Sequence, residues 1–224
     1  MADVLSENRN IGAITEEEQE ILRSKTVLIA GCGGLGGFCA DMLSRLGIGC
    51  LVLCDCDEFE PSNLNRQLYS NVTTLGINKA VATSRYITQH SLCKVRTYPM
   101  RITKSNAYAL TENCDLVIDA LDNVQTRFEL EKACEKRGIP MITGGISHWY
   151  GQVSVIFPGD NSLEKIFGTA PVKKRPPVLG FVAANIASCE VAEACKTLLG
   201  YPSLRHKLLI IDLKDFSAKI LPLN

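Results

Sequence analysis

Short apolar runs alternate with amphipathic stretches along the first two thirds of the chain. Residues 26–30 are apolar and rich in β-branched side chains, which predicts a buried strand. Apolar residues then recur near helical spacing over 35–47, and Gly47 predicts the end of that helix. A second buried strand is expected at 50–55. This order predicts a βαβ unit with parallel strands and a right-handed crossover.

The alternation continues as far as residue 145. It predicts helices at 77–90 and 124–138 and strands at 94–100, 115–121 and 139–145. Near the N-terminus, Thr15 and Glu18 form a capping box, which starts a helix that ends near Leu22.

The pattern changes after residue 150. Residues 150–160 alternate between apolar and polar and end in a turn, which is typical of an antiparallel strand. A long helix ends at Gly200, and residues 207–223 predict two strands joined by a turn. The segment 158–181 contains four prolines, so we expect an irregular surface loop there.

Together these elements predict a single domain over residues 1–224, with a helical segment at 1–24. The fold class is α/β. We expect a Rossmann-like, mostly parallel sheet with helices on both faces and an antiparallel extension at the C-terminal end.

Composition excludes several classes of protein. Lys and Arg together number 24, as do Asp and Glu together, so the formal charges cancel. The chain therefore lacks the net positive charge that would indicate a nucleic-acid partner. The N-terminus lacks the features of a signal peptide, and no apolar run approaches the roughly 20 residues of a membrane span. We therefore expect a cytoplasmic protein without membrane contact. The ten scattered cysteines then remain reduced, and most are expected to fill the core.

A glycine-rich turn follows the first strand. Gly31, Gly33, Gly34 and Gly36 fit the dinucleotide pattern G-x-G-x-x-G, in which backbone N–H groups and a helix N-terminus approach phosphate oxygens. Asp55 ends the second strand, where a carboxylate commonly binds a ribose. These features agree equally with NAD and with ATP.

Polar residues further along favour a triphosphate. Asp57, Ser62, Asn63, Arg66 and Lys79 follow the second strand, and the pair Asp122 and Asn123 follows the strand at 115–121. The carboxyl ends of parallel strands meet at one crevice, so we expect these residues to lie together. Two cations, polar amides and a carboxylate able to hold Mg²⁺ suit a substitution reaction at phosphorus.

These stretches give the chain a specific resemblance. The runs "GCGGLGG", "DCDEFEPSNLNRQLYS", "DALDNVQTRFEL" and "GFVAANIASCEVAEACKTLLG" resemble the ThiF/MoeB/HesA family, bacterial relatives of ubiquitin-activating E1 enzymes. The resemblance covers roughly residues 9–212. It implies an enzyme that uses ATP and Mg²⁺ to adenylate the C-terminal glycine of a small ubiquitin-like sulfur-carrier protein with a Gly-Gly end. The carboxylate attacks the α-phosphate and pyrophosphate leaves. The carrier, and whether it serves thiamine, molybdopterin or another sulfur pathway, stay open.

The resemblance also implies a role for each matched residue. Gly34 lies against the phosphates, Asp55 binds the ribose, and Ser62 to Arg66 line the nucleotide. Asn63 and Arg66 polarise phosphate oxygens, and Lys79 neutralises the developing charge. Asp122 binds Mg²⁺ with Asn123 beside it. Arg9 matches an arginine that reaches the nucleotide of the other subunit, which implies a homodimer with shared sites.

The chain departs from the family pattern at its cysteines. The two C-x-x-C pairs that hold zinc in many relatives have no counterpart, so we expect no structural zinc. The segment 169–177 also lacks the cysteine that forms a thioester or persulfide in some relatives. We predict that catalysis stops at the acyl-adenylate, that sulfur comes from a separate protein, and that Cys189 and Cys195 are buried.

Three other functions stay open. An NAD-dependent oxidoreductase would need a substrate acid or base, for which there is no convincing candidate. An enzyme that activates the carboxylate of a tRNA-bound nucleoside would need a basic RNA surface, for which Lys173, Lys174 and Arg175 are the visible candidates. A non-catalytic scaffold would not require the retained Arg66, Lys79 and Asp122.

Each polar residue also has a purely structural interpretation. Asp55 or Asp57 can bond backbone in a turn, Arg66 can pair with Glu58 or Glu60, and Lys79 can be a solvated helix residue. Asp122 and Asn123 can form a helix N-cap, since both residue types cap well. His148 and Trp149 can contact a partner's tail, although a packed aromatic is the favoured interpretation.

Overall fold

The computed structural model describes residues 9–168 and 176–223. Its α-helices are α1 (Glu16–Ser24), α2 (Gly36–Leu46), α3 (Lys79–His90), α4 (Ala107–Leu110), α5 (Val124–Arg137), α6 (Leu163–Phe167) and α7 (Gly180–Leu198). Its strands are β1 (Thr26–Ala30), β2 (Cys50–Cys54), β3 (Lys94–Tyr98), β4 (Leu116–Asp119), β5 (Met141–Ser147), β6 (Tyr150–Ile156), β7 (Lys207–Asp212) and β8 (Ser217–Pro222). A 3-10 turn, η2, covers Pro61–Asn63.

The strands form one eight-stranded sheet in the order β3-β2-β1-β4-β5-β6-β7-β8. Strands β1 to β5 pair in parallel, and β6, β7 and β8 continue the sheet antiparallel. The predicted α/β fold with an antiparallel C-terminal extension is confirmed. Strands β2 and β3 follow β1 on one side of it, and β4 and β5 lie on its other side. The strand order therefore reverses between β1 and β4, and in open sheets such a switch point is where ligands bind.

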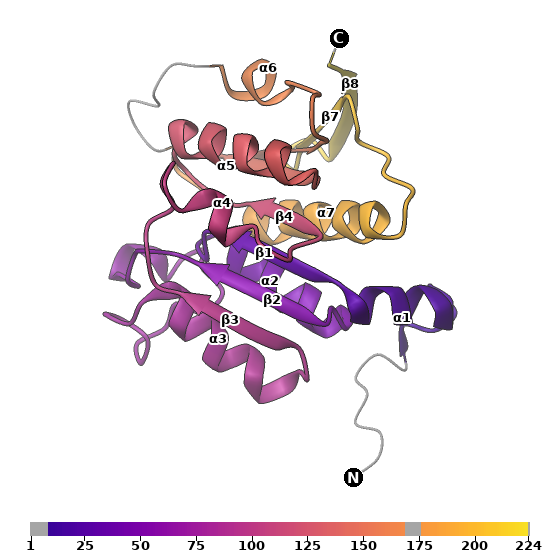
Figure 1. The fold of residues 1–224 in the computed structure, drawn as a ribbon. Coiled ribbons are helices and arrows are strands. Elements are labelled where there is room, and N and C mark those ends of the chain that lie inside the picture. Colours follow the sequence, from indigo (N-terminus) through magenta and orange to yellow (C-terminus); the bar gives the residue numbers. More distant parts are fainter. Residues whose placement is uncertain (1–8, 169–175, 224) are drawn as a thin grey trace.

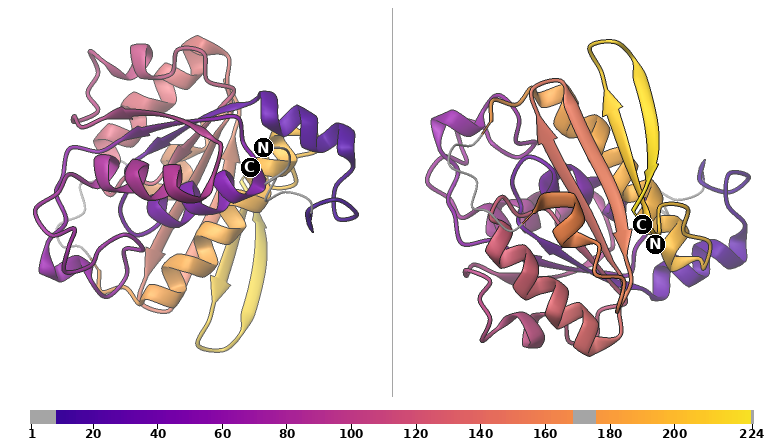
Figure 2. Two further views of the ribbon diagram at one scale, coloured as in Figure 1. Left: turned by 90° about the horizontal axis from the view of Figure 1, so that it is seen from below. Right: turned by 90° about the horizontal axis from the view of Figure 1, so that it is seen from above.

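Alternation along the strands divides the core into two layers. Val27 and Ile29 of β1 pack with buried residues of α2, α3 and α7, whereas Leu28 and Ala30 pack with those of α4, α5 and α6. Successive strand residues point to opposite faces, so an apolar run such as β1 must be covered on both sides. Figure 2 shows α5 and α7 on opposite sides of the sheet.

Several elements extend or modify the sequence prediction. The capping box of Thr15 and Glu18 is present, and α1 runs on to Ser24. The short helix α4, the turn η2 and the helix α6, which lies inside 158–181, were not predicted. The hairpin of β7 and β8 adds to the edge of the sheet (Figures 1 and 2). All residues of β8 are exposed. Of the described helices, none combines the length and apolar character that crossing a membrane requires.

The cysteines are all free thiols, and six of them are buried in the core: Cys32, Cys39, Cys54, Cys93, Cys114 and Cys134. The core role predicted for most of them is therefore confirmed. The prediction that Cys189 and Cys195 are buried is wrong: both are half-buried, because they lie on the flanks of α7 beside its buried stripe. Cys56 is exposed at the end of β2.

One ionisable side chain lies inside the layer between α7 and the sheet. Glu190 is fully buried, and its carboxylate accepts a bond from Cys39 Sγ at 3.4 Å. A Cβ atom on Gly144 of β5 would lie 2.3 Å from Glu190 Oε1, so only glycine leaves room for the carboxyl group there. Burial raises the pKa of Glu190 to about 8; the Cys39 bond opposes the rise, the charge of Asp119 adds to it, and the charge of Arg127 opposes it. Glu190 is thus protonated in the folded protein at neutral pH.

We predict that Glu190→Gln makes the protein's stability less dependent on pH. Between about pH 5 and pH 8 the unfolded glutamate has lost its proton whereas the folded one keeps it. The wild-type free energy of unfolding should therefore fall relative to the variant as pH rises, by up to about 1.4 kcal/mol per pH unit. Above the folded pKa the difference becomes constant. Urea denaturation at several pH values measures it, and parallel profiles for the two proteins would contradict it.

Glu193, one turn along α7, provides the matched control. Burial acts to raise its pKa, but bonds from Lys196, Leu204 and Ser203 lower it overall. This carboxylate is ionised in both states above about pH 5.5, so Glu193→Gln should destabilise by a nearly constant amount up to about pH 8.

Candidate functional site

The carboxyl ends of β1, β2 and β4 meet at one edge of the sheet. Gly31 N–H donates to the Cys54 carbonyl at 2.8 Å, and Ala120 N–H donates to the Ala30 carbonyl at 3.0 Å. The residues that follow these three strands are therefore neighbours. They carry most of the polar residues selected from the sequence.

The glycine turn allows α2 to start directly on the end of β1. Gly31 has a φ of +93°, and a Cβ on it would lie 2.8 Å from the Ala120 carbonyl oxygen. A Cβ on Gly36 would lie 1.8 Å from the Gly31 carbonyl oxygen, so this contact also requires glycine. Leu35 at the N-cap supplies no side-chain acceptor. The first N–H groups of α2 thus lack the side-chain cap that Thr15, Asn78 and Asn123 give to other helices, and such a terminus suits an anion.

Asp55 supports this turn through its side chain. Its Oδ2 accepts from Cys32 N–H at 2.7 Å and its Oδ1 from Asp57 N–H at 2.8 Å. Burial raises the pKa of Asp55, while these two N–H donors oppose the rise. The structural interpretation of Asp55 as a turn residue is therefore confirmed. Asp55, Cys56 and Asp57 bring potential ligand atoms within 4.8 Å of one another, but both Asp55 oxygens already have backbone donors.

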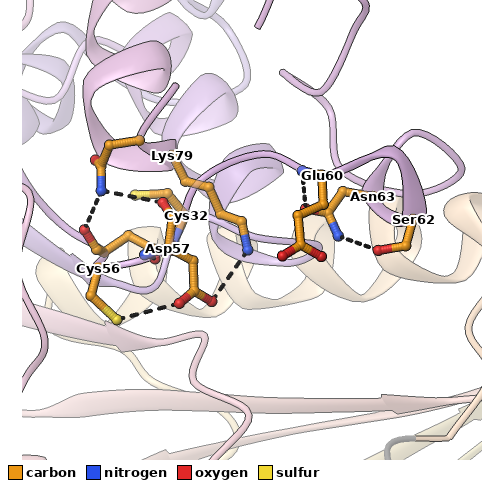
Figure 3. A network of polar contacts seen from close by, with 9 residues as sticks. Cys32, Cys56, Asp57, Glu60, Ser62, Asn63 and Lys79 are labelled. Carbon is orange, nitrogen blue, oxygen red and sulfur yellow. Dashed lines mark hydrogen bonds and ion pairs between the residues drawn. The ribbon is translucent and has the colours of Figure 1, made fainter. Parts of the chain in front are cut away.

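Lys79 extends into the site from the first residue of α3 (Figure 3). Its side chain is only 9 % exposed, and its Nζ lies 3.5 Å from Asp57 Oδ2, on a carboxylate that is 49 % exposed. Partial burial acts to raise the pKa of Asp57, but Lys79 and the Cys56 thiol bring it below its ordinary value. The interpretation of Lys79 as a solvated helix residue is wrong. Lys79 is a buried cation, and its ion pair with the half-exposed carboxylate of Asp57 is long.

The turn that follows β2 holds the amide and arginine candidates. Asn63 is buried; its Oδ1 accepts from Glu60 N–H at 3.1 Å and its Nδ2 contacts Ser62 Oγ at 3.3 Å (Figure 3). Its amide therefore shapes the turn itself. The guanidinium of Arg66 donates to the Ser62 carbonyl and to Asn65 Oδ1, both at 2.8 Å, and not to the glutamates considered from the sequence. Its Cγ would lie 4.0 Å from a Cβ on Gly34, so Arg66 borders the glycine turn.

Gln67 is a site residue that sequence reasoning did not select. It is buried, and its amide nitrogen would lie 3.5 Å from a Cβ on Gly33. Among the described residues, no hydrogen-bond partner is found for its Oε1. A buried amide oxygen with no partner among the described residues, beside the glycine turn, suits a polar ligand at this edge. Its only sequence signal was membership of the run "SNLNRQ".

The loop after β4 carries the acidic candidates. Asn123 is the N-cap of α5 and accepts from Thr126 N–H at 3.0 Å, so the helix-cap interpretation is confirmed for Asn123. Asp122 precedes it and is exposed. An exposed carboxylate is an oxygen ligand of the type that Mg²⁺ takes, so the chemistry of Asp122 fits that ion.

A buried ion pair between α5 and the end of β4 holds this loop in place. Arg127 of α5 donates to Asp119 Oδ2 at 2.8 Å, and Thr143 Oγ1 of β5 donates to the same oxygen at 2.7 Å. Both residues stand in the run "DALDNVQTRFEL", but the sequence analysis assigned a role to neither. The available signal was helical spacing, since Arg127 lies four residues after the cap residue Asn123.

Arg9 is not brought to this site within one chain. It is exposed, and its neighbour Asn10 donates to the Leu46 carbonyl at 3.3 Å, at the C-terminal end of α2. The glycine turn lies at the opposite end of that 11-residue helix, about 15 Å away along its axis.

The remaining candidates lie elsewhere. Trp149 packs on Phe181 with ring centroids 5.2 Å apart and stays 40 % exposed, and His148 N–H donates to the Pro177 carbonyl at 2.7 Å. Trp149 thus packs against a second ring, but Phe181 is itself 52 % exposed, so the contact does not decide between the two interpretations of Trp149. Lys173, Lys174 and Arg175 lie outside the described residues.

The site therefore combines an uncapped helix N-terminus, two cations and an exposed carboxylate at one sheet edge. Backbone N–H groups, Arg66 and Lys79 can neutralise phosphate oxygens, and Asp122 can hold a divalent cation against them. This set of groups stabilises negative charge and positions it. It suits a substitution at phosphorus better than hydride transfer, which needs no such cluster of cations.

The family is established by comparison with known proteins. A model of the ThiF family matches residues 5–224, and the chain belongs to that family. It is 37 % identical over 204 residues to the adenylyltransferase and sulfurtransferase MOCS3 of Dictyostelium discoideum, covering 87 % of this chain and 48 % of that protein. The sulfur carrier protein adenylyltransferase of Thermus thermophilus is 34 % identical over 221 residues, covering 91 % of this chain and 80 % of that protein. The SAMP-activating enzyme E1 of Haloferax volcanii is 31 % identical over 214 residues, with 92 % and 79 % covered. The chain thus spans about half the length of MOCS3 and most of the other two.

Solved structures share the fold. A crystal structure of PaaA superposes with a TM-score of 0.80 at 24 % identity, covering 93 % of this chain and 76 % of that one. A crystal structure of Escherichia coli MccB superposes with a TM-score of 0.82 at 20 % identity, covering 92 % and 64 %.

We predict that Gly36→Ala destabilises the protein while Gly33→Ala does not. The added methyl group of Gly36→Ala meets the Gly31 carbonyl, and such overpacking typically costs about 1–3 kcal/mol. The nearest atom to a Cβ on Gly33 is at 3.5 Å, an ordinary contact. Gly33→Ala should therefore stay within about 1 kcal/mol of wild type. Urea denaturation measures both, and equal stabilities for the two variants would contradict the close helix–strand contact.

Proposed function

We propose that this chain is an adenylyltransferase that activates the C-terminal glycine carboxylate of a small ubiquitin-like sulfur-carrier protein with ATP. The observation that carries the proposal is the gathering of Arg66 and Lys79 around the glycine turn, opposite the Asp122 loop. The relatives named as sulfur-carrier and SAMP-activating enzymes support the substrate class. A crystal structure of MccB in the presence of ATP, at a TM-score of 0.75, supports the nucleotide.

The proposed reaction is one substitution at phosphorus. A carboxylate oxygen of the carrier attacks the α-phosphorus of ATP, the new oxygen–phosphorus bond forms, and the bond to the β-phosphate oxygen breaks. The products are the carrier acyl-adenylate and pyrophosphate. No general base is required, because an α-carboxyl group with a pKa of about 3.5 is already ionised at neutral pH. Catalysis then depends on positioning and on charge neutralisation.

Each residue has a proposed part in that reaction. The turn from Gly31 to Gly36 presents N–H groups to the phosphates, and Asp55 receives the ribose. Arg66 and Lys79 neutralise the charge that develops on the phosphate oxygens; Lys79 leaves its long pair with Asp57 to do so. Ser62 and Asn63 form the wall beside the nucleotide.

Asp122, with Asn123 beside it, is the proposed ligand of Mg²⁺. When bound, the ion shields the charge on the phosphates and on the departing pyrophosphate. Asp122 is exposed, so a hydrated cation can approach it from solvent.

We further propose that Arg9 completes the nucleotide site of a second copy, which makes the enzyme a homodimer. The position of Arg9 at the far end of α2 supports this, because it cannot serve the glycine turn of its own chain. In this proposal residues 1–224 form one adenylation domain in the cytoplasm, and sulfur is supplied by a separate protein.

We predict that Asp122→Ala abolishes most ATP–pyrophosphate exchange. The assay uses ³²P-pyrophosphate, ATP, Mg²⁺ and purified sulfur carriers ending in Gly-Gly, including those of the similar Thermus and Haloferax enzymes. Removing the proposed metal ligand should lower the rate about a hundredfold or more. A carrier lacking its last glycine should give no exchange with the wild-type enzyme.

Asp215→Ala is the matched control, because Asp215 is an exposed aspartate in the turn between β7 and β8. It should exchange at the wild-type rate. Absence of exchange with every carrier, together with measurable NAD binding, would favour the oxidoreductase instead. Exchange stimulated only by tRNA would favour the enzyme that activates a tRNA-bound nucleoside.

A further inference from the structure

Arg127 is the most highly connected buried cation in the described chain. It lies on the first turns of α5 with a side chain only 6 % exposed. One guanidinium nitrogen donates to Asp119 Oδ2, Thr143 Oγ1 and the Gly144 carbonyl, at 2.8, 2.9 and 3.0 Å. The other donates to the Leu121 carbonyl. A buried arginine with so many partners fixes the groups around it.

These partners lie on the segment that leads to Asp122. Asp119 is the last residue of β4 and also accepts from Leu121 N–H at 3.1 Å. The Leu121 carbonyl, one peptide before Asp122, faces Arg127. Arg127 thus holds the turn from Asp119 to Leu121 at two acceptors, the Asp119 carboxylate and the Leu121 carbonyl. Thr143 and Gly144 of β5 bind the same guanidinium, so the loop is held in a fixed position relative to the sheet.

An aromatic ring packs against the guanidinium of Arg127. The Arg127 guanidinium lies 4.2 Å from the centroid of the Phe167 ring, at the end of α6. That ring also borders β5, since a Cβ on Gly145 would lie 3.3 Å from Phe167 Cε1. The ring limits access of water to the hydrogen bonds of Arg127, which strengthens them.

The geometry requires arginine rather than any cation. The planar fork reaches a side-chain carboxylate, a hydroxyl and two carbonyls at once, whereas a lysine ammonium is a single point with three donors. Lysine would keep the charge beside Asp119 but would not hold Asp119 and the Leu121 carbonyl in one fixed relation.

We infer that Arg127 is a positioning residue for metal–nucleotide binding: it fixes the loop that carries Asp122 against β5. It does not contact the reacting atoms itself. The inference rests on the proposed function, since it assigns Arg127 to the placement of the proposed metal ligand.

The test compares Arg127→Lys with wild type in two assays that report separately. Electron paramagnetic resonance with Mn²⁺ and ATP, without carrier protein, measures metal–nucleotide affinity in the absence of turnover. Pyrophosphate exchange with carrier measures kcat and KM for ATP. We expect about tenfold weaker Mn²⁺ affinity and a kcat at least about tenfold lower, the range seen when groups that orient metal ligands are changed. ATP affinity in excess chelator should stay within about twofold of wild type, because the phosphate-binding turn is untouched.

Arg137→Lys is the matched control on the same helix. Arg137 also stacks on an aromatic ring, 3.9 Å from the centroid of Tyr108, and donates to the Tyr108 carbonyl at 2.9 Å. It lies at the opposite end of α5 from the site. Its lysine variant should match wild type in metal affinity and kcat.

Thr143→Val covers the case in which Arg127→Lys fails to fold. It keeps the side-chain shape and removes the hydroxyl between Arg127 and Asp119. It should weaken Mn²⁺ affinity in the same direction by about threefold.

The outcomes separate this inference from the function on which it rests. A wild-type protein that neither binds Mn²⁺ with ATP nor exchanges pyrophosphate overturns the proposed function, and the inference with it. An active wild type, with folded Arg127→Lys equal to it in metal affinity and kcat, overturns the inference alone. A lower melting temperature of the variant with unchanged metal affinity per folded molecule does the same, because it shows a purely structural role.

Discussion

The position of β1 between β2 and β4 is the constraint on which the site depends. Parallel pairing on both sides brings three carboxyl ends to one edge, and the glycines at 31 and 36 then let α2 start within contact distance of Ala120. Any side chain at these two glycines would separate the helix from the strand ends. The candidate phosphate site, the Asp55 turn and the Asp122 loop share this edge because the backbones there approach so closely.

Buried polar groups secure that edge from within. Asp119 and Arg127 form a pair inside the sheet–helix layer, and Glu190 lies protonated on the other face of β5, where Gly144 leaves room for it. Breaking a buried pair leaves one uncompensated charge, so neither partner of the Asp119–Arg127 pair can be removed cheaply. The local rigidity therefore comes from hydrogen bonds between residues far apart in sequence, and not from the glycine turn alone.

This arrangement explains which features the sequence could predict. The strands, the long helices and the fold class follow from local periodicity, and the position of Lys79 follows from the N-cap Asn78 beside it. The short helices α4 and α6 lack enough residues for a periodic signal. Arg127 and Gln67 could not be predicted as site residues, because their importance depends on burial and on partners distant in sequence, which a local sequence pattern does not show. The sequence resemblance assigned the Asn63 amide to phosphate oxygens. In the structure its Oδ1 instead accepts from the N–H of Glu60, the N-cap residue of η2, so the amide is used inside its own turn.

The pair of Lys79 and Asp57 links the structure to the proposed chemistry. A lysine that is 9 % exposed has lost most of its hydration, yet its recorded partner is a half-exposed carboxylate at 3.5 Å. In the proposed reaction a phosphate oxygen would take the place of Asp57 at Lys79, so the buried ammonium group would stay paired throughout the exchange. Asp57 can return to water when the exchange occurs, whereas Asp55 cannot, because two backbone N–H groups hold it. The two neighbouring carboxylates thus divide the work. Asp55 maintains the turn, and in the proposed reaction Asp57 would balance the charge of Lys79 until a phosphate group takes its place.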